Sequence, residues 1–274
     1  MSKDQSDALC LDPNGGLPRL LEIMARLRDP ETGCPWDIEQ TYASIVPYTI
    51  EEAYEVADAI AQNDMAELEG ELGDLLLQVI YYTQMGSEDG HFDFASVTKN
   101  IADKMIHRHP HVFGDESRDK SSEQQTADWE KIKASERAAK GKVKTRTLDG
   151  VAKNLPALTR AVKLQKRAAR VGFDWPETSQ VLDKIAEESA ELVEAKDTLT
   201  HAEQVEEFGD LMFVMANLGR HLKIDPEEAL RAANRKFQKR FEFIEDALET
   251  NGKTPAQSNL QEMDALWDKA KLAE

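Results

Sequence analysis

Two sets of four carboxylates with the same internal spacing constrain this chain more than any other feature. In each set a Glu-x-x-Glu pair precedes a Glu-x-x-Asp pair, and the second acid stands 16 residues before the third. The sets are Glu52, Glu55, Glu71 and Asp74, and Glu188, Glu191, Glu207 and Asp210. Acids at i, i+3 repel one another on a helix face unless a cation is bound there. Because hard divalent cations prefer carboxylate oxygens, the pattern predicts two metal sites, with Mg²⁺ as the expected ion.

The carboxylate sets belong to a longer internal repeat. A Gly-x-x-Trp motif precedes each set, and Lys-x-x-x-Arg and Trp-x-x-x-Lys motifs follow it in the same order. The motifs begin at Gly33, Lys104 and Trp129 in the first half, and at Gly172, Lys236 and Trp267 in the second. Four elements in one order indicate the duplication of a whole domain.

The duplication predicts two domains joined by a linker. Residues 136–150 (ERAAKGKVKTRTLDG) are polar, locally basic and poor in large apolar side chains, as is typical of a linker. We therefore expect one domain over residues 17–135 and a second over residues 151–274. Residues 1–16 end in Pro-Asn-Gly-Gly and are expected to form a flexible tail.

Apolar residues recur with the period of an α-helix through most of the chain, which predicts an all-α fold. One stripe is Leu72, Leu75, Leu76, Val79 and Ile80, and another is Leu211, Val214, Met215 and Leu218. Polar turns at residues 63–64 and 197–201 fall midway between the second and third acids of each set. Because eight helical residues rise about 12 Å, an antiparallel hairpin would bring both acid pairs to the same height.

The composition narrows the class of protein. With 41% hydrophobic and 31% charged residues, a chain of this length is expected to be globular. A net charge of −18 argues against a polymeric nucleic acid as partner, because phosphate binding needs a basic surface. The sequence has no apolar run that could cross a membrane and no signal-peptide pattern, so a cytoplasmic location is expected. Cys10 and Cys34 match no metal spacing and are expected to be free thiols.

The basic and aromatic residues of the repeat allow two interpretations. Lys236 and Arg240 stand at i, i+4 on one helix face and can clamp a polyphosphate, or they can form ion pairs on an acidic surface. The matching pair Lys104 and Arg108 in the first half favours phosphate contact. Trp267 can stack on a base, although a helical Trp is more often part of the core.

Several segments closely resemble the MazG family of nucleoside triphosphate pyrophosphohydrolases. They are GCPWD (33–37), PYTIEEAYEV (47–56), GELGDLLLQV (70–79) and RHPHVF (108–113), and then GFDW, EESAELVEA, EEFGDLMF and NRKFQKRF in the second half. The resemblance covers residues 17–272. It implies tandem all-α, four-helix-type domains that usually form tight homodimers, and Mg²⁺-dependent hydrolysis of NTPs and dNTPs to monophosphate and pyrophosphate. It also implies housecleaning of the nucleotide pool and, in some bacteria, a link to the alarmone ppGpp.

The resemblance also implies roles for individual residues. The family's metal ligands fall on Glu188, Glu191, Glu207 and Asp210, and its phosphate and nucleotide contacts fall on Lys236, Arg240, Trp267 and Lys271. The same residue types occur in the first repeat. Glu191 and Glu188 are the candidate catalytic residues, because one carboxylate of the set is expected to accept the proton of the attacking water.

Two positions differ between the repeats and favour the second as the active one. Lys184 stands one turn before the second acid set and can contact phosphate, whereas the first repeat has Tyr48 there. Asn217 stands seven residues after the last acid of the second set, where its amide can bind a base or sugar. The first repeat has the bulkier Tyr81 at that position. In two-domain members of the family the C-terminal repeat usually carries the hydrolysis.

Other functions remain open on the sequence. One is a narrower pyrophosphatase of the same superfamily that acts on dUTP, dCTP or phosphoribosyl-ATP. Another is a helical module that binds nucleotides or a protein without releasing pyrophosphate. Activity in both repeats, on different nucleotides, is a further alternative.

Overall fold

Helices form the regular structure of both halves of the chain, which confirms the all-α prediction. The computed structural model describes residues 1–122, 124–125, 128–129, 132, 135–136 and 146–273, and no strand occurs among them. The chain divides into two compact units, Met1–Ala134 and Ser135–Glu274. Most of the linker expected at residues 136–150 lies outside the described residues, because 137–145 are not among them.

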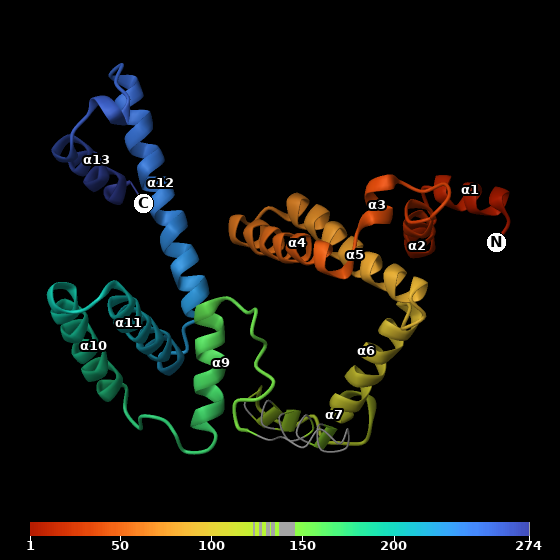
Figure 1. Cartoon of the computed structure of the whole chain (residues 1–274), viewed down its shortest axis with the longest axis horizontal. Coiled ribbons are helices and arrows are strands. Elements are labelled where there is room, and N and C mark those ends of the chain that lie inside the picture. The colour runs from red at the N-terminus through yellow and green to blue at the C-terminus, as the bar shows by residue number, and fades with distance from the viewer. Residues whose placement is uncertain (123, 126–127, 130–131, 133–134, 137–145, 274) are drawn as a thin grey trace. The chain divides into compact units, whose positions relative to one another are not determined.

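The first unit is built on a hairpin of two long helices, α4 (Tyr42–Gln62) and α5 (Met65–Glu88) (Figure 1). Helix α4 begins with a capping box between Thr41 and Ser44, and it ends at Asn63, whose φ of 57° is left-handed. Asp64 then caps α5 by accepting from the backbone N–H groups of residues 66 and 67, at 3.1 and 3.0 Å. The polar turn at residues 63–64 is therefore confirmed.

Shorter helices flank this hairpin. They are α1 (Lys3–Leu11), α2 (Gly16–Leu27) and α3 (Pro35–Glu39) before it, and α6 (Phe94–Arg108) and α7 (Pro110–Phe113) after it. Helix α2 packs against α5, and these two helices and α4 supply the buried core. The core residues are Met24, Ile45, Ile80, Tyr81 and Met85.

The interpretation of residues 1–16 as a flexible tail is wrong for the helical part of that segment. Lys3–Leu11 forms α1, which begins with a capping box between Ser2 and Gln5 and packs against α2. The buried hydroxyl of Ser6 donates to Glu22, and Asp7 forms an ion pair with Arg26. The composition concealed this helix, because polar contacts, and not an apolar stripe, attach it to α2.

The second unit repeats the hairpin as α10 (Thr178–Thr198) and α11 (His201–His221) (Figure 1). Thr200 caps α11 in a capping box with Glu203, so the chain reverses within two residues and the turn expected in this region is confirmed. Helix α9 (Ala157–Ala169) packs against α11. The long helix α12 (Pro226–Thr250) is followed by the short helix η1 (Pro255–Gln257) and by α13 (Leu260–Leu272), which packs against α12.

Candidate active site

The two hairpins gather three acids of each carboxylate set. In the first unit, carboxylate oxygens of Glu52, Glu55 and Glu71 all lie within 4.8 Å of one another. In the second unit the same holds for Glu188, Glu207 and Asp210. Both trios take acids from the two facing helices of a hairpin, as the spacing of 16 residues requires. An all-oxygen donor set of this size fits one hard divalent cation.

The fourth acid of each set lies outside the trio, yet its charge acts on it. Burial raises the pKa of Glu207, and the charges of Glu191, Glu188 and Asp210 raise it further. In the first unit burial likewise raises the pKa of Glu52, with the charge of Asp74 next in importance. Each cluster therefore carries uncompensated negative charge, which a bound cation would relieve.

Lys184 supplies a positive charge at the second cluster. Its Nζ lies 2.8 Å from a carboxylate oxygen of Glu187 and 2.8 Å from one of Glu188, which is only 5% exposed. The hydrogen bonds to Glu187 and Glu188 hold the pKa of Lys184 well above its usual value. Because the ammonium has three N–H donors, contact with a phosphate, as the sequence suggested, can use the third beside these two carboxylates.

A pocket of about 550 Å³ lies beside α11 in the second unit, within the size range of small-molecule sites. Asn217 lines it and is 3% exposed, and its Oδ1 accepts from Nε of Arg220 at 2.8 Å. Most of the remaining lining is apolar or aromatic. The lining includes Leu148, Leu164, Ala168, Phe173, Trp175 and Phe213. Such walls suit a flat, weakly polar group such as a nucleobase.

Three polar residues of this pocket were not assigned a role from the sequence. The Nε2 of Gln165 donates to the Phe213 carbonyl at 2.8 Å, while its buried Oε1 has no partner among the described residues. Asp174 forms an ion pair with Arg220. Burial acts to raise the pKa of Asp174, but the Arg220 guanidinium holds it below its usual range. Asp174 lies inside the GFDW motif, which is a signal that could have found it, whereas nothing in the sequence marked Gln165.

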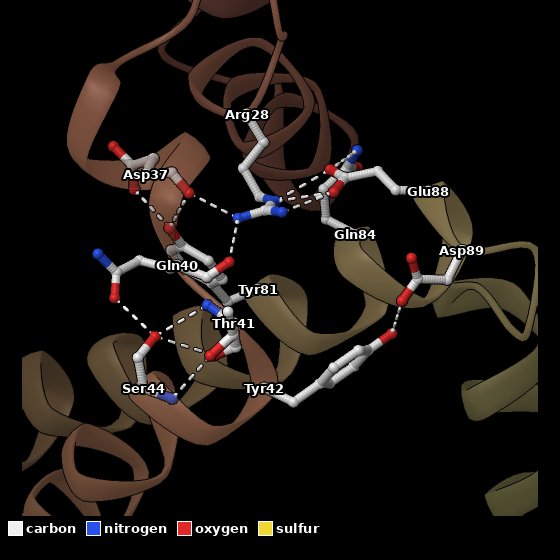
Figure 2. Close-up of polar contacts among 10 residues, drawn as sticks. All are labelled: Arg28, Asp37, Gln40, Thr41, Tyr42, Ser44, Tyr81, Gln84, Glu88 and Asp89. Carbon is white, nitrogen blue, oxygen red and sulfur yellow. Dashed lines mark hydrogen bonds and ion pairs between the residues drawn. The ribbon is translucent and has the colours of Figure 1, made fainter.

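In the first unit, Tyr81 takes the sequence position that Asn217 has in the second, and hydrogen bonds hold its side chain in place (Figure 2). Its hydroxyl donates to the carbonyl and the carboxylate of Asp37, at 2.9 and 3.0 Å. Burial raises the pKa of Tyr81 to about 12, so the hydroxyl keeps its proton at neutral pH. Tyr81 is only 4% exposed, so neighbouring atoms fill the space around its side chain.

Arg28 covers the Tyr81 ring and joins the segments around it (Figure 2). Its guanidinium lies over the Tyr81 ring, 5.5 Å from the centroid, and donates to the carbonyls of Asp37 and Gln40. Two of its nitrogens also bind Glu88, with Nη2 2.7 Å from Oε2. The end of α2, helix α3 with the residue after it, and the end of α5 are thereby joined around Tyr81, which takes the sequence position of the pocket residue Asn217.

The basic and aromatic residues expected to bind phosphate lie on α12 and α13. The Arg240 guanidinium lies 5.3 Å from the centre of the Trp267 ring, which also packs on Phe237. Lys236 is exposed, and Lys271 pairs with Asp268 at 2.9 Å. In Figure 1, α12 diverges from α11, and α13 packs on its far part, apart from the α10–α11 hairpin. The structure thus groups Arg240 with Trp267 but places them on elements separate from the acid trio.

The corresponding residues of the first unit are only partly described. Trp129 donates through Nε1 to the carbonyl of Arg108 at 2.9 Å, and its ring packs on His109. Lys104 is exposed on α6. Lys133, the last member of the repeated motif, lies outside the described residues.

Comparison with known proteins agrees with the geometry of the two hairpins. A model of the MazG nucleotide pyrophosphohydrolase domain matches residues 40–113, and a model of phosphoribosyl-ATP pyrophosphohydrolase matches residues 155–237. The chain is 50% identical over 260 residues to a nucleoside triphosphate pyrophosphohydrolase of Escherichia coli K12, covering 94% of this chain and 98% of that protein.

Two further relatives show how far the similarity extends. A Thermotoga maritima protein, named nucleoside triphosphate pyrophosphohydrolase/pyrophosphatase MazG, is 44% identical over 252 residues, 92% of this chain and 94% of its own. A Mycobacterium tuberculosis nucleoside triphosphate pyrophosphohydrolase is 36% identical over 157 residues, 57% of this chain and 46% of its own. With both acid clusters carried by all-α hairpins, the chain belongs to the MazG family of nucleoside triphosphate pyrophosphohydrolases.

Proposed function

We propose that this enzyme hydrolyses NTPs and dNTPs to the monophosphate and pyrophosphate in its second unit, with Mg²⁺, as a cytoplasmic housecleaning activity. One observation carries the assignment to this unit. Helix α11 contributes Asp210 to the acid trio and Asn217 to the wall of the open pocket. Seven helical residues span about 10 Å, a separation that suits a triphosphate at the acids and a nucleoside in the pocket.

The acids of the second unit divide into two roles. Glu188, Glu207 and Asp210 have oxygens close enough to hold one cation together. A bound Mg²⁺ supplies positive charge to phosphate oxygens and orients water for in-line attack. Glu191 lies outside that trio and is exposed, which leaves its carboxylate available to accept the proton of the attacking water. Glu188, buried and paired with Lys184, fits the holding role better than proton transfer.

The pocket residues position the nucleoside. The amide nitrogen of Asn217 can donate to a base or sugar, because its oxygen is already used by Arg220. The free Oε1 of Gln165 offers an acceptor. Aromatic walls from Phe213 and Trp175 hold any base without reading its edges, which supports a broad nucleotide range.

We further infer that the enzyme works as a homodimer. Each hairpin exposes apolar stripes that a two-helix layer cannot bury by itself. In the first unit the stripes are Val46, Ile50 and Tyr54 on α4 and Leu72, Leu76 and Val79 on α5, and in the second they include Val205, Phe208 and Met215 on α11. Two such hairpins packed face to face form a four-helix bundle, which is the architecture expected of this family.

The dimer also accounts for the position of the basic residues. Lys236, Arg240, Trp267 and Lys271 lie on helices that diverge from the acids of their own unit (Figure 1). A second copy that covers the α10–α11 hairpin brings its own α12 and α13 toward these acids. We therefore propose that phosphate is held by acids of one copy and by basic residues of the other.

The test is pyrophosphate release from the eight common NTPs and dNTPs, in wild type and in the matched variants Glu191→Ala and Glu55→Ala. We expect Glu191→Ala to abolish turnover and Glu55→Ala to retain it, because the pocket that Asn217 lines belongs to the second unit, whereas the buried Tyr81 takes the matching position in the first. The reverse pattern would move catalysis to the first unit. No pyrophosphate from the wild type would favour the nucleotide-binding module.

A second candidate substrate is phosphoribosyl-ATP. The family model that matches residues 155–237 is named for its hydrolysis, and the site chemistry is the same cleavage between phosphates. Adding phosphoribosyl-ATP to the panel separates the two. A rate for it far above every NTP would replace the proposed broad substrate range with a narrow one.

A further inference from the structure

The two cysteines of the chain, far apart in sequence, line one pocket in the first unit. The pocket has a volume of about 380 Å³. Cys10 belongs to the last turn of α1, and Cys34 is the residue that precedes α3. Both thiols are free and half-buried. The other residues that line the pocket are Ile23, Arg26, Leu27, Thr32 and Gly33.

Helix α2 contacts both cysteines. The backbone N–H of Cys34 donates to the carbonyl of Leu27 at 2.8 Å, which fixes Cys34 beside the end of α2. The carbonyl of Cys10 accepts from Nε of Arg19 at 2.9 Å. Arg26, the neighbour of Leu27, hydrogen-bonds to the carboxylate of Asp7 and lines the pocket together with Cys10. The pocket is therefore the space between two thiols anchored on the same helix.

Arg26 lines the pocket together with Cys10, which places a guanidinium at the cavity that an electrophile would enter. Asp7 forms an ion pair with the same guanidinium. A structural zinc site is a poor alternative, because the pocket lining offers two thiols and no histidine or carboxylate.

We propose that Cys10 and Cys34 form a peroxide-responsive dithiol that closes to an intramolecular disulfide. The Cys10 thiolate attacks one oxygen of hydrogen peroxide, the O–O bond breaks, and hydroxide leaves to give a sulfenic acid. The Cys34 thiolate then attacks that sulfur, the S–O bond breaks, and a second hydroxide leaves. With the two thiol protons, one peroxide and two thiols yield one disulfide and two waters. A small dithiol reverses the bond by exchange.

The attachment of α1 to α2 lets the two cysteines adjust their separation. A disulfide requires Cα atoms within about 7 Å of each other, so the bond fixes the end of α1 within that distance of Cys34. Helix α1 is joined to α2 by residues 12–15, and Gly16 has a φ of 52°, which glycine adopts without strain. Polar contacts, rather than a large apolar face, attach α1 to α2. The bond would tie α1 to the turn that precedes the buried Asp37.

The experiment treats the reduced full chain with stoichiometric hydrogen peroxide, blocks remaining thiols, and measures intact mass and a non-reducing peptide map. We expect the mass to fall by two hydrogens, no blocking group to be added, and a linked Cys10–Cys34 peptide that dithiothreitol separates. In Cys34→Ser, Cys10 should stop at a sulfenic acid that dimedone traps. Arg26→Met should slow the formation of the bond several-fold.

Several results would overturn the proposal. One is the accumulation of sulfinic acid at both cysteines without a linked peptide. Another is a disulfide formed only between two copies of the chain. If Cys34 in Cys10→Ser reacted as fast as Cys10 does in Cys34→Ser, the assignment of Cys10 as the attacking thiol would be wrong.

Discussion

The Arg28–Glu88 ion pair allows a test of how much the contacts of Arg28 stabilise the first unit. The Arg28 side chain is 9% exposed and the Glu88 side chain 33% exposed. We expect Glu88→Gln, which keeps the shape and removes the charge, to destabilise the first unit. The Arg28 guanidinium would keep its backbone acceptors at Asp37 and Gln40, but it would lose the charge that compensates it.

The expected loss of stability follows from the burial of the ion pair and from the position of Glu88 at the end of α5. Breaking a buried pair by removing one partner costs about 3–5 kcal/mol, and partial exposure of Glu88 reduces this. Glu88 also ends α5, where a negative charge opposes the helix dipole, so its removal returns about 0.3–1 kcal/mol. We therefore expect a net loss of about 2 kcal/mol in the stability of the first unit.

Hydrogen exchange read by mass spectrometry resolves this loss by segment. Amides of α2 and of the turn into α3 should lose protection in Glu88→Gln, while those of α10 and α11 keep theirs. Asp103→Asn is the matched control, because it removes the same charge from an exposed pair with Lys99 in the same unit. The control should change stability by less than about 0.5 kcal/mol. Equal effects of the two substitutions would refute the reasoning.

Three other predictions concern the acid cluster, the pocket and a helix cap. The raised pKa of Glu207 means that the folded state keeps this proton at a pH where the unfolded state has lost it. The stability of the metal-free protein therefore falls as pH rises from 4.5 through the raised value. Mg²⁺ should raise the melting temperature more at mildly alkaline than at mildly acidic pH, and an equal gain at both would contradict this. Asn217→Tyr, which copies the first unit, should raise KM for every nucleotide. As a control, Tyr82→Phe removes a hydroxyl that contacts Thr49 in the first unit, and it should leave steady-state kinetics unchanged. Asp64→Ala removes the cap of α5 and should lower stability by about 1 kcal/mol in urea unfolding, and an unchanged midpoint would show that the cap is dispensable.

The sequence predicted those parts of the structure that depend on local spacing. Three acids of each hairpin gather because the helical rise is constant and because Asn63, Asp64 and Thr200 are strong cap and turn residues. Contacts between distant segments left no such pattern. Arg28 reaches Glu88 across 60 residues, and no periodicity links them. The same is true of Arg220 and Asp174, 46 residues apart.

Helix α1 shows a different limit of sequence reasoning. Its capping box, Ser2 with Gln5, was present in the sequence, but the Pro-Asn-Gly-Gly that follows indicated a tail. Partners on α2, among them Glu22 and Arg26, explain why the segment is ordered as a helix. Those partners also bring Cys10 close to Cys34, a proximity that sequence separation concealed.

The divergence of α12 from α11 has a genetic consequence. If acids and basic residues of one working site come from different copies, two inactive alleles can complement each other. A mixed dimer of a Glu188→Gln copy and a Lys236→Ala copy would contain one intact site and one site that carries both lesions. Such a pair of alleles would restore activity when expressed together, and neither would do so alone.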